Sequence, residues 1–504
     1  MCQAGLPLLE GRCLLLHCLE IFKENSPLAT LFLCGNQRVI YLKDPDKNML
    51  KITAVVKFPI FFIGFIGSSF VTFSQTAPKS ALSDSGQALT LDQCVAYALK
   101  NQPALHQSLI GTDITRATNA INLAGWLPQV GVSGNLTHYL ALPTAFVKNS
   151  STNSTVQQKT GVINTAIPVL SATQTIFNPS LIYAYKAAPL YIQQSEQITD
   201  SVKINIVAGV SKTFYGLLLT LEQINVLKED TARLAKNVQD TYHQYVGGIV
   251  DETDYNEAQI TLNNSKTQLK TAIENITPQY AALKQVMGFP PEQQFNVSFD
   301  TLQMMKDVAF DTTQQLQYPK RIEFQQLQTS KKIQGQQVDY YRKAWLPTVG
   351  AFFDYDYEFQ NNSFGSLFSQ AYPYSFVGLS VSMPIFTGFA RTQSLHRAHL
   401  QGQLLDLSEV NLKSQIYSEY TSALASYKSN LYDLDSQHQN VALARRTYDI
   451  VALQYQQGVV AYLNVITAES NLITSEIGYL NALFQLLSSK IDLEKSMGEI
   501  TVRK

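Results

Sequence analysis

Two groups of side chains in this sequence have types and spacings that could do chemistry. His396 and His399 lie three residues apart, which would place two imidazoles on one helix face as metal ligands. No third ligand is evident, so a solvated helix surface is favoured. Asp354, Asp356 and Glu358 alternate along a predicted strand and face one way, which suits a water-filled lumen better than an acid–base pair. Because no nucleophile elbow, phosphate loop or metalloprotease helix occurs either, we expect no enzyme activity, no metal site and no cofactor.

Composition places the chain among apolar, weakly charged proteins. Of its 504 residues, 15% are charged and 45% are hydrophobic, whereas about 25% are charged in an ordinary soluble chain. A net charge of −1 leaves no basic field that could hold nucleic acid, and the apolar content is too high for a disordered chain. Only Cys94 follows residue 34, so the later chain can form no intrachain disulfide and no cysteine cluster.

Residues 49–75 have the layout of a secretory signal peptide, with lysines, an uncharged apolar run and a small or polar end. A membrane anchor at 58–78 is the alternative, but Pro, Gly and Ser residues interrupt that run. Met49 is then the initiator, and residues 1–48 are a start-site artefact or leader. A linker over 76–88 precedes the remaining chain, which we expect to be exported.

Four landmarks occur twice in the same order, at offsets of 219, 209, 210 and 210 residues. They are Trp126-Leu127-Pro128 with Trp345-Leu346-Pro347, Ile176-Phe177 with Ile385-Phe386, Tyr245 and Gly248 with Tyr455 and Gly458, and Met287-Gly288 with Met497-Gly498. The copies cover residues 89–300 and 301–504. They differ in length almost only before Ile-Phe, which indicates an exposed loop there.

Each copy contains two segments with the period of a β-strand. They lie at about 129–142 and 161–177 in the first copy, and at about 348–359 and 374–386 in the second. One apolar and one polar face suit the wall of a membrane β-barrel, with a soluble sandwich sheet as the alternative. Four strands cannot close a barrel, because about eight is the practical minimum. If they span a membrane, several chains must share one barrel.

Very long helices follow the strands. Gly388 and Gly458 are 70 residues apart, and Pro179 and Gly248 are 69 apart. A helix of about 70 residues extends roughly 105 Å, which no compact domain can bury alone. We therefore expect these helices to pack on partners along their length. Gly248 and Gly458 are predicted turn points, after which the helical pattern runs back towards Gly288 and Gly498.

These segments together resemble the TolC-like outer membrane factor family of outer membrane efflux proteins. The resemblance spans about residues 88–500, and its most specific parts are the tip sequences Tyr245–Tyr255 and Tyr455–Val465. It implies a mixed α and β membrane protein that forms a trimer. Four strands per chain would give a twelve-stranded β-barrel in the outer membrane, continued by a long α-helical barrel in the periplasm, with two structural repeats per chain.

The resemblance also implies a docking tip at the predicted turns. Tyr245, Gly248, Tyr455 and Gly458 correspond to family residues that meet a periplasmic adaptor protein attached to an inner-membrane pump. A Tyr-x-x-Gly turn can also be an ordinary helix C-cap, and we expect both roles here.

The tip of better-known family members is closed by an acidic constriction. The candidates in this chain are Asp251, Glu252, Asp254, Asn464 and Thr467. Asn464 and Thr467 stand where those members carry carboxylates, and Val460 stands at the position of a gating Arg, so we expect no salt-bridge lock in the closed state. The alternative role of the three first-tip carboxylates is a favourable acidic first turn of the returning helix.

Strand aromatics could form a girdle at the membrane interface or pack a core. The girdle candidates are Tyr139, Tyr355, Tyr357, Tyr374 and Phe376. We interpret the chain as the outer membrane channel of a tripartite efflux or type I secretion system, a passive exit duct. Its expected partners are further copies of the chain, an adaptor, a pump and outer membrane lipid, with no nucleic acid. The alternatives are a periplasmic coiled-coil interaction protein without a membrane-spanning barrel and, with no sequence support, a secreted hydrolase.

Overall fold

The computed structural model describes residues 88–148, 155–298 and 308–500, together with the backbone of three short strands near the N-terminus. The chain divides into two units, Met1–Leu82 and Ser83–Lys504. In the first unit β1 (Thr30–Cys34), β2 (Gln37–Leu42) and β3 (Leu50–Ile52) form an antiparallel sheet. The interpretations of residues 1–48 as a leader, 49–75 as a signal peptide and 76–88 as a linker otherwise fall outside the described residues.

The second unit contains a four-stranded antiparallel sheet. Its strands are β5 (Gln129–His138), β8 (Asn164–Phe177), β10 (Thr348–Asn361) and β11 (Ala371–Ser382). The spatial order is β11-β10-β8-β5, so β5 and β11 are the two edges. β11 ends before the expected residue 386, because Pro384 lacks the amide that would continue the ladder. β5 likewise ends before the expected residue 142, ahead of Pro143.

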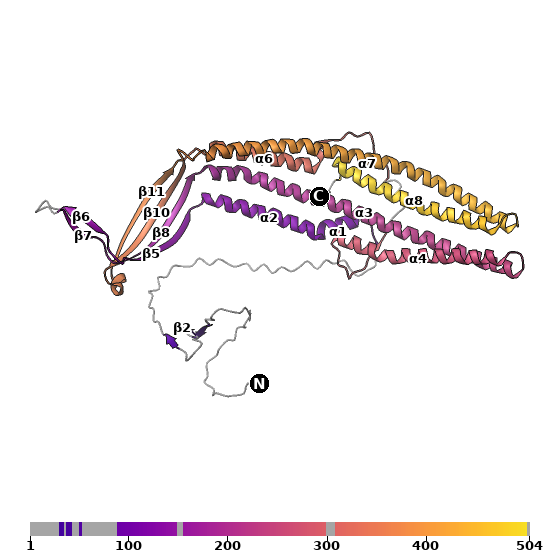
Figure 1. The fold of residues 1–504 in the computed structure, drawn as a ribbon, viewed down its shortest axis with the longest axis horizontal. Helices are drawn as coiled ribbons and strands as arrows, with labels where there is room; N and C mark the ends of the chain where they lie inside the picture. Colours follow the sequence, from indigo (N-terminus) through magenta and orange to yellow (C-terminus); the bar gives the residue numbers. More distant parts are fainter. Residues whose placement is uncertain are drawn as a thin grey trace, which may run out of the picture. The chain divides into compact units, whose positions relative to one another are not determined.

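The long first-copy loop is partly structured. In the exposed loop that the sequence predicts there, β6 (Thr144–Lys148) and β7 (Thr155–Lys159) form an antiparallel hairpin. The corresponding second-copy loop carries the short 3-10 helix η3 (Phe364–Ser369). Both additions lie at the end of the sheet away from the long helices (Figure 1).

Seven α-helices make up most of the second unit's described residues. They are α1 (Leu91–Asn101), α2 (Pro103–Leu123), α3 (Pro179–Val246), α4 (Glu252–Met287), α6 (Ile322–Lys343), α7 (Ala390–Gln456) and α8 (Tyr462–Met497). A capping box starts α1, because the Thr90 amide donates to Gln93 Oε1 at 3.0 Å and the Gln93 amide donates to Thr90 Oγ1 at 3.4 Å. α3 and α7 span 68 and 67 residues.

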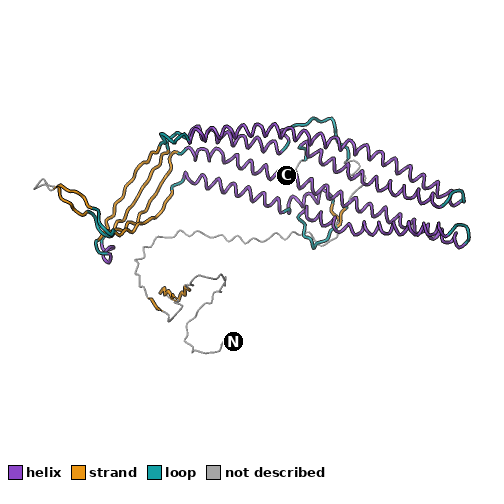
Figure 2. Tube along the Cα trace, in the orientation of Figure 1, coloured by secondary structure: helices purple, strands orange, loops and turns teal. Residues whose placement is uncertain are grey.

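Helices and strands follow one spatial order. α3 contacts α2 and α4 on one side and α6 and α8 on the other, and α7 contacts α6 and α8. α2 leads into β5, β8 into α3, α6 into β10, and β11 into α7. Figures 1 and 2 show the sheet at one end of this unit and the turns of the two long helical hairpins at the other. The unit is therefore a layer with two open sides. One side is formed by β5 and α2, and the other is formed by β11 and α7.

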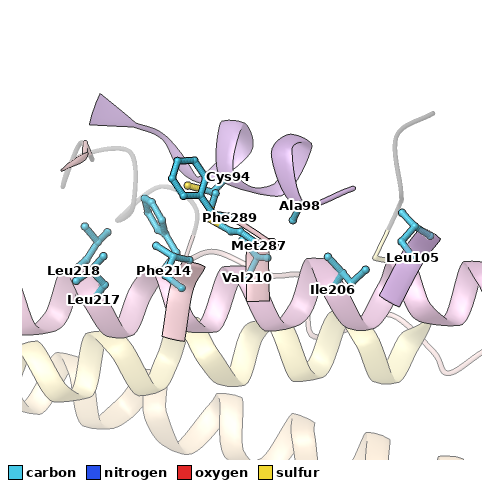
Figure 3. Packing of buried hydrophobic residues seen from close by; sticks show 11 residues of the cluster. Cys94, Ala98, Leu105, Ile206, Val210, Phe214, Leu217, Leu218, Met287 and Phe289 are labelled. Atoms are coloured by element: carbon cyan, nitrogen blue, oxygen red, sulfur yellow. The ribbon is translucent and has the colours of Figure 1, made fainter. Parts of the chain in front are cut away.

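A buried core lies where α1 and the end of α4 pack on the middle of α3. The side chains of Val210, Phe214 and Leu217 point from α3 towards Cys94 and Met287 (Figure 3). Burial raises the pKa of the Cys94 thiol to about 12. By length and composition α3 is the one helix among the described residues that could cross a bilayer, but half of its most apolar window is buried inside the protein. This central position explains its apolar character.

Gly288 and Gly498 end α4 and α8 at close backbone contacts. Both have left-handed backbone, with φ of 68° and 73°. A Cβ at Gly288 would lie 2.9 Å from the Asn101 carbonyl oxygen, and one at Gly498 would lie 2.8 Å from the Lys320 carbonyl oxygen. The returning helices thus abut the first helices of their own repeats, so two shorter helices line each long one.

We predict that Gly288→Ala destabilises the protein more than Gly248→Ala. Both substitutions place a side chain on left-handed backbone, which costs about 1–2 kcal/mol. Gly248 has open space around its Cβ position, whereas at Gly288 overlap with the α1–α2 junction adds about 1–3 kcal/mol. Thermal unfolding of the two purified variants in detergent checks this, and equal unfolding temperatures would contradict it.

Candidate functional site

The two tips are closed by matching glycine turns. Gly248 has φ of 70° and Gly458 has φ of 73°, and each follows a long helix. The Ile249 amide donates to the Gln244 carbonyl at 2.8 Å, and Val459 makes the corresponding bond at 2.9 Å. These are Schellman-type C-caps, so the expected capping role is built into both turns. The adaptor-docking role of these residues stays a prediction.

The equivalent tyrosines of the two tips have different contacts. The Tyr245 ring stacks on Tyr255 of its own hairpin, with centroids 6.2 Å apart. The Tyr455 hydroxyl instead donates to Gln244 Oε1 at 2.6 Å, and its ring packs on Tyr462. Burial raises the pKa of the Tyr455 phenol. Tyr455 therefore joins one tip to the other, while Tyr245 stays within its hairpin.

The five constriction candidates divide into two sets. Asp251 is the N-cap residue of α4 and makes no side-chain cap bond, and Glu252 and Asp254 lie in the first turn of that helix. Their charges favour the positive end of the helix dipole, as the alternative interpretation expects. Asn464 and Thr467 are exposed one turn apart on α8, and the Thr467 hydroxyl donates to the Leu463 carbonyl at 2.9 Å. Their part in a constriction stays a prediction.

The tips also expose apolar side chains that the sequence analysis did not single out. They are Val246, Ile249, Val459 and Leu463. Apolar side chains so exposed at a helical turn are typical of a surface that binds another protein. The repeat carries a sequence signal for this surface, because Gly-Ile-Val and Gly-Val-Val recur at the two turns.

A buried ionic cluster joins α3, α4, α7 and α8, the four helices of the two hairpins. Arg233 of α3 donates from Nη2 to Asp230 Oδ1 at 2.9 Å and from Nε to Glu469 Oε1 of α8 at 2.7 Å. The Ser265 hydroxyl of α4 donates to Asp230 Oδ2 at 2.7 Å. The guanidinium also lies over the ring of Tyr448 of α7, 5.2 Å from its centroid. One cation thus links both hairpins.

Burial determines the electrostatics of this cluster. The side chains of Asp230 and Glu469 are each 1% exposed, and burial raises the pKa of both carboxyl groups. Burial also opposes the charged form of Arg233, yet the hydrogen bond and charge of Glu469 raise its pKa overall. No sequence signal identified the cluster, because its members are 3 and 236 residues apart and match no motif.

The sheet has one apolar and one polar face. The apolar face exposes large side chains from all four strands, including Val130, Val132, Leu136, Leu170, Phe353, Tyr355, Tyr357, Val377, Leu379 and Val381. Asp354, Asp356 and Glu358 lie on the other face, because alternate residues of a strand point to opposite sides. The three carboxylates therefore share one face, as their spacing predicts.

The girdle candidates do not share one face. Tyr355 and Tyr357 lie on the apolar face with their rings 6.4 Å apart. Tyr374 pairs directly opposite Asp356, and Phe376 opposite Asp354, which places both on the polar face. Tyr139 follows the end of β5 and is exposed. Tyr374 and Phe376 therefore lie on the face opposite to Tyr355 and Tyr357, because the strand register matches their face of β11 with the acidic face of β10. A membrane girdle built from these candidates stays a prediction.

His396 and His399 are exposed on α7. No cluster of three His, Cys, Asp or Glu side chains that could hold a metal ion occurs in the part of the chain that the structure describes. The two imidazoles therefore have no further ligand there.

We predict that Arg233→Met destabilises the protein by about 3–5 kcal/mol, because two buried carboxylates lose their cation. A carboxyl whose folded pKa is raised stabilises the fold below its unfolded pKa and loses that contribution as pH rises through the raised value. The loss in Arg233→Met should therefore be larger at pH 8 than at pH 5 in thermal unfolding.

Lys270→Met, which removes the exposed pair with Glu274, is the matched control and should show little loss at either pH. A loss that does not depend on pH would contradict this assignment.

Comparisons with known proteins agree with this architecture. The family model "Outer membrane efflux protein" matches residues 95–289 and 320–499, one segment in each repeat. No curated protein sequence matches the chain.

Similar solved structures include the outer membrane protein VceC from Vibrio cholerae, with a TM-score of 0.63 and 16% identity over 81% of this chain and 96% of that one. The CmeC outer membrane channel from Campylobacter jejuni has a TM-score of 0.63 and 19% identity over 81% and 85%. The open-state MtrE outer membrane channel from Neisseria gonorrhoeae has a TM-score of 0.61 and 16% identity over 81% and 88%.

The family match covers most of the chain, in the two repeats where the sequence first suggested the resemblance, and the solved structures share the fold. The chain therefore belongs to the outer membrane efflux protein family, whose members are channels of the outer membrane and not enzymes.

Proposed function

We propose that three copies of this chain form a passive exit duct, with a twelve-stranded barrel in the outer membrane and a helical tunnel in the periplasm. The observation that carries the proposal is the layer with two open sides. The sheet ends at β5 on one side and at β11 on the other, and the helical part ends at α2 and α7 on the same two sides. Neighbouring copies can close both parts at once.

The sheet edges support closure between copies. β5 and β11 are 10 and 12 residues long, and each pairs with a strand on one side only. Long, regular edges present unpaired backbone groups that bind another strand. In a membrane such groups must be satisfied, so a spanning sheet has to close into a barrel. Pairing of β5 with β11 of the next copy gives twelve strands from three chains.

The helical edges carry matching apolar stripes. On α2 the exposed residues are Ile110, Ile114 and Ile121, and on α7 they are Leu400, Leu404, Leu407 and Val410. Both stripes lie in the helical segments next to the sheet, so they are at similar heights. Several exposed apolar side chains along one helix mark a contact with another protein surface. Contact between α2 of one copy and α7 of the next buries both.

The exposed apolar face of the sheet suits lipid. A spanning strand needs about 9–11 residues, and the four strands are 10, 14, 14 and 12 residues long. A periplasmic coiled-coil protein without a barrel would leave this apolar face in water. The polar face then lines a wet lumen, through which substrate passes without covalent change.

Partner proteins supply the energy and the selection of cargo in this proposal. The exposed apolar tip residues lie at the end of the helical layer, in the turns that contain Tyr245, Gly248, Tyr455 and Gly458. A periplasmic adaptor attached to an inner-membrane pump can dock there. The sequence contains no phosphate-binding loop, so transport energy comes from the pump.

We predict that detergent-extracted protein has three times the mass of one mature chain. Asp substitution in both stripes, as in Ile114→Asp with Leu404→Asp, should release monomers, because charges enter the apolar contact between copies. The same substitution at exposed Tyr432, away from the sheet end of α7, is the control and should leave the assembly intact. Light scattering after size exclusion measures the mass, and a wild-type monomer would contradict the duct.

We predict that Gly458→Leu abolishes export while leaving the trimer and its membrane insertion intact. The added side chain has open space and blocks only an external partner, although left-handed backbone adds strain. Gly388→Leu is the matched control, since Gly388 has φ of 57° and open space but lies at the sheet end of α7. Export measured in cells that depend on this channel should fail for Gly458→Leu only. Normal export by that variant would count against docking at the tip.

A further inference from the structure

Basic residues gather at the junction between the sheet and the helices α2, α3, α6 and α7 (Figure 1). The four segments that join helix to strand, each extended by seven helical residues or about 10 Å, are 116–128, 178–186, 336–347 and 383–397. Asp339 is the one acidic residue in these segments. Their basic residues, here called the basic collar, are Arg116, Lys186, Arg342, Lys343, Arg391 and Arg397.

The chain neutralises only part of the basic collar. Lys343 Nζ donates to Asp339 Oδ2 at 2.7 Å, and Arg342 lies 3.8 Å from the other oxygen. The bond from Lys343 lowers the pKa of the Asp339 carboxyl. Arg116 pairs with Asp113 at 2.9 Å, on the side away from the sheet. The other collar cations form no salt bridge within the described residues, and they are Lys186, Arg391 and Arg397.

Helix capping does not explain these three cations. Arg342 and Lys343 lie in the last turn of α6, where the helix dipole stabilises positive charge. Arg391 is instead the second residue of α7, whose first turn contains no acidic residue. A cation at the positive end of a helix dipole is unfavourable unless an anion compensates it. Because the described chain provides none, the anion comes from outside it.

Aromatic and apolar side chains indicate where that anion lies. The two tryptophans of the chain, Trp126 and Trp345, each lie between a helix of the junction and the strand that follows it. Ile385, Phe386 and Phe389 between β11 and α7 are exposed. Tryptophan prefers the boundary between hydrocarbon and headgroups in a bilayer. The headgroup layer is roughly 5–8 Å thick, so the collar beside these residues lies at headgroup depth in the proposed barrel.

Tyrosines hold the collar helices together at this level. The rings of Tyr183 of α3 and Tyr340 of α6 lie 5.5 Å apart, and Tyr340 packs on Tyr341 at 5.1 Å. Arg397 of α7 donates from Nη2 to the Tyr341 hydroxyl at 3.3 Å. That bond orients the guanidinium without neutralising it. A guanidinium held in this way is suited to phosphate, which it binds through paired hydrogen bonds.

We propose that the basic collar binds the phosphate headgroups of anionic phospholipids at the periplasmic surface of the outer membrane, in preference to zwitterionic lipids. The proposal rests on the proposed barrel, which places the junction at that surface. The headgroup supplies the negative charge that Lys186, Arg391 and Arg397 lack, and the acyl chains contact the exposed apolar residues beside them. Three copies repeat the collar around the barrel, so bound lipid fixes the depth of the duct in the membrane.

The chain contains its own probe for this lipid, because Trp126 and Trp345 are its only tryptophans and both lie beside the collar. Bromine atoms on lipid acyl chains quench tryptophan fluorescence on contact. Purified protein is reconstituted in equal mixtures of phosphatidylglycerol and phosphatidylcholine, with bromine on one lipid or on the other. The ratio of the two quenching levels gives the relative binding constant of the anionic lipid at the collar.

The collar variant is Lys186→Gln with Arg391→Gln and Arg397→Gln. The matched control removes one lysine on α3, one on α4 and one arginine on α7, all exposed and nearer the tips, as Lys236→Gln with Lys266→Gln and Arg446→Gln. We expect wild type and control to prefer phosphatidylglycerol about fivefold, and the collar variant to show no preference.

Two results would overturn the proposal. One is equal quenching by both lipids in wild type, and the other is an unchanged preference in a folded collar variant. A collar variant that dissociates into monomers with its lipid preference intact also counts against it, because the cations then contact a neighbouring copy.

If the collar variant does not fold, the salt dependence of wild type decides. The preference must fall towards one between about 0.05 M and about 0.5 M NaCl, because salt screens exposed charges, and a constant preference would contradict the collar. Absence of quenching by either lipid means that the junction does not meet a bilayer. That result refutes the proposed barrel itself, so the two failures are distinct.

Discussion

The constraint that shapes this structure is unpaired backbone and exposed apolar surface, which a single chain leaves uncovered at its two sides. A sheet of four strands and a layer of long helices end at the same two sides, with unpaired strand edges on β5 and β11 and apolar stripes on α2 and α7. Neither part can close alone, because four strands are too few for a barrel and the apolar stripes on α2 and α7 are exposed. In the proposed duct, neighbouring copies therefore cover both parts.

Two repeats of one pattern have acquired different roles while keeping the same skeleton. The glycines that end each long helix and each returning helix share left-handed backbone, because that geometry tolerates almost no other residue. Tyr245 and Tyr455 are equivalent in sequence, yet one stacks within its hairpin and the other bonds across to the neighbouring hairpin. The two repeats therefore keep the same backbone at the glycine turns, while equivalent side chains such as Tyr245 and Tyr455 make different contacts.

Charge is scarce in this chain, and two of its buried charged sites differ in whether a cation neutralises them. Arg233 neutralises Asp230 and Glu469 between the two hairpins, in a position where loss of the cation leaves two buried carboxylates. Asp356 has no such partner in the sheet. The first arrangement holds the helices together, and the second leaves a negative face towards the proposed lumen.

The sequence by itself determined the repeats, the four strands, the long helices and their turn points, because periodicity, Gly and Pro act locally along the chain. It also determined that the three strand carboxylates share one face, since alternation along a strand is a local property. Only the tertiary structure decided which faces of different strands coincide, and it separated Tyr374 and Phe376 from Tyr355 and Tyr357. It also brought Glu469 to Arg233 across 236 residues, because register and helix packing arise from contacts between distant segments that no local pattern encodes.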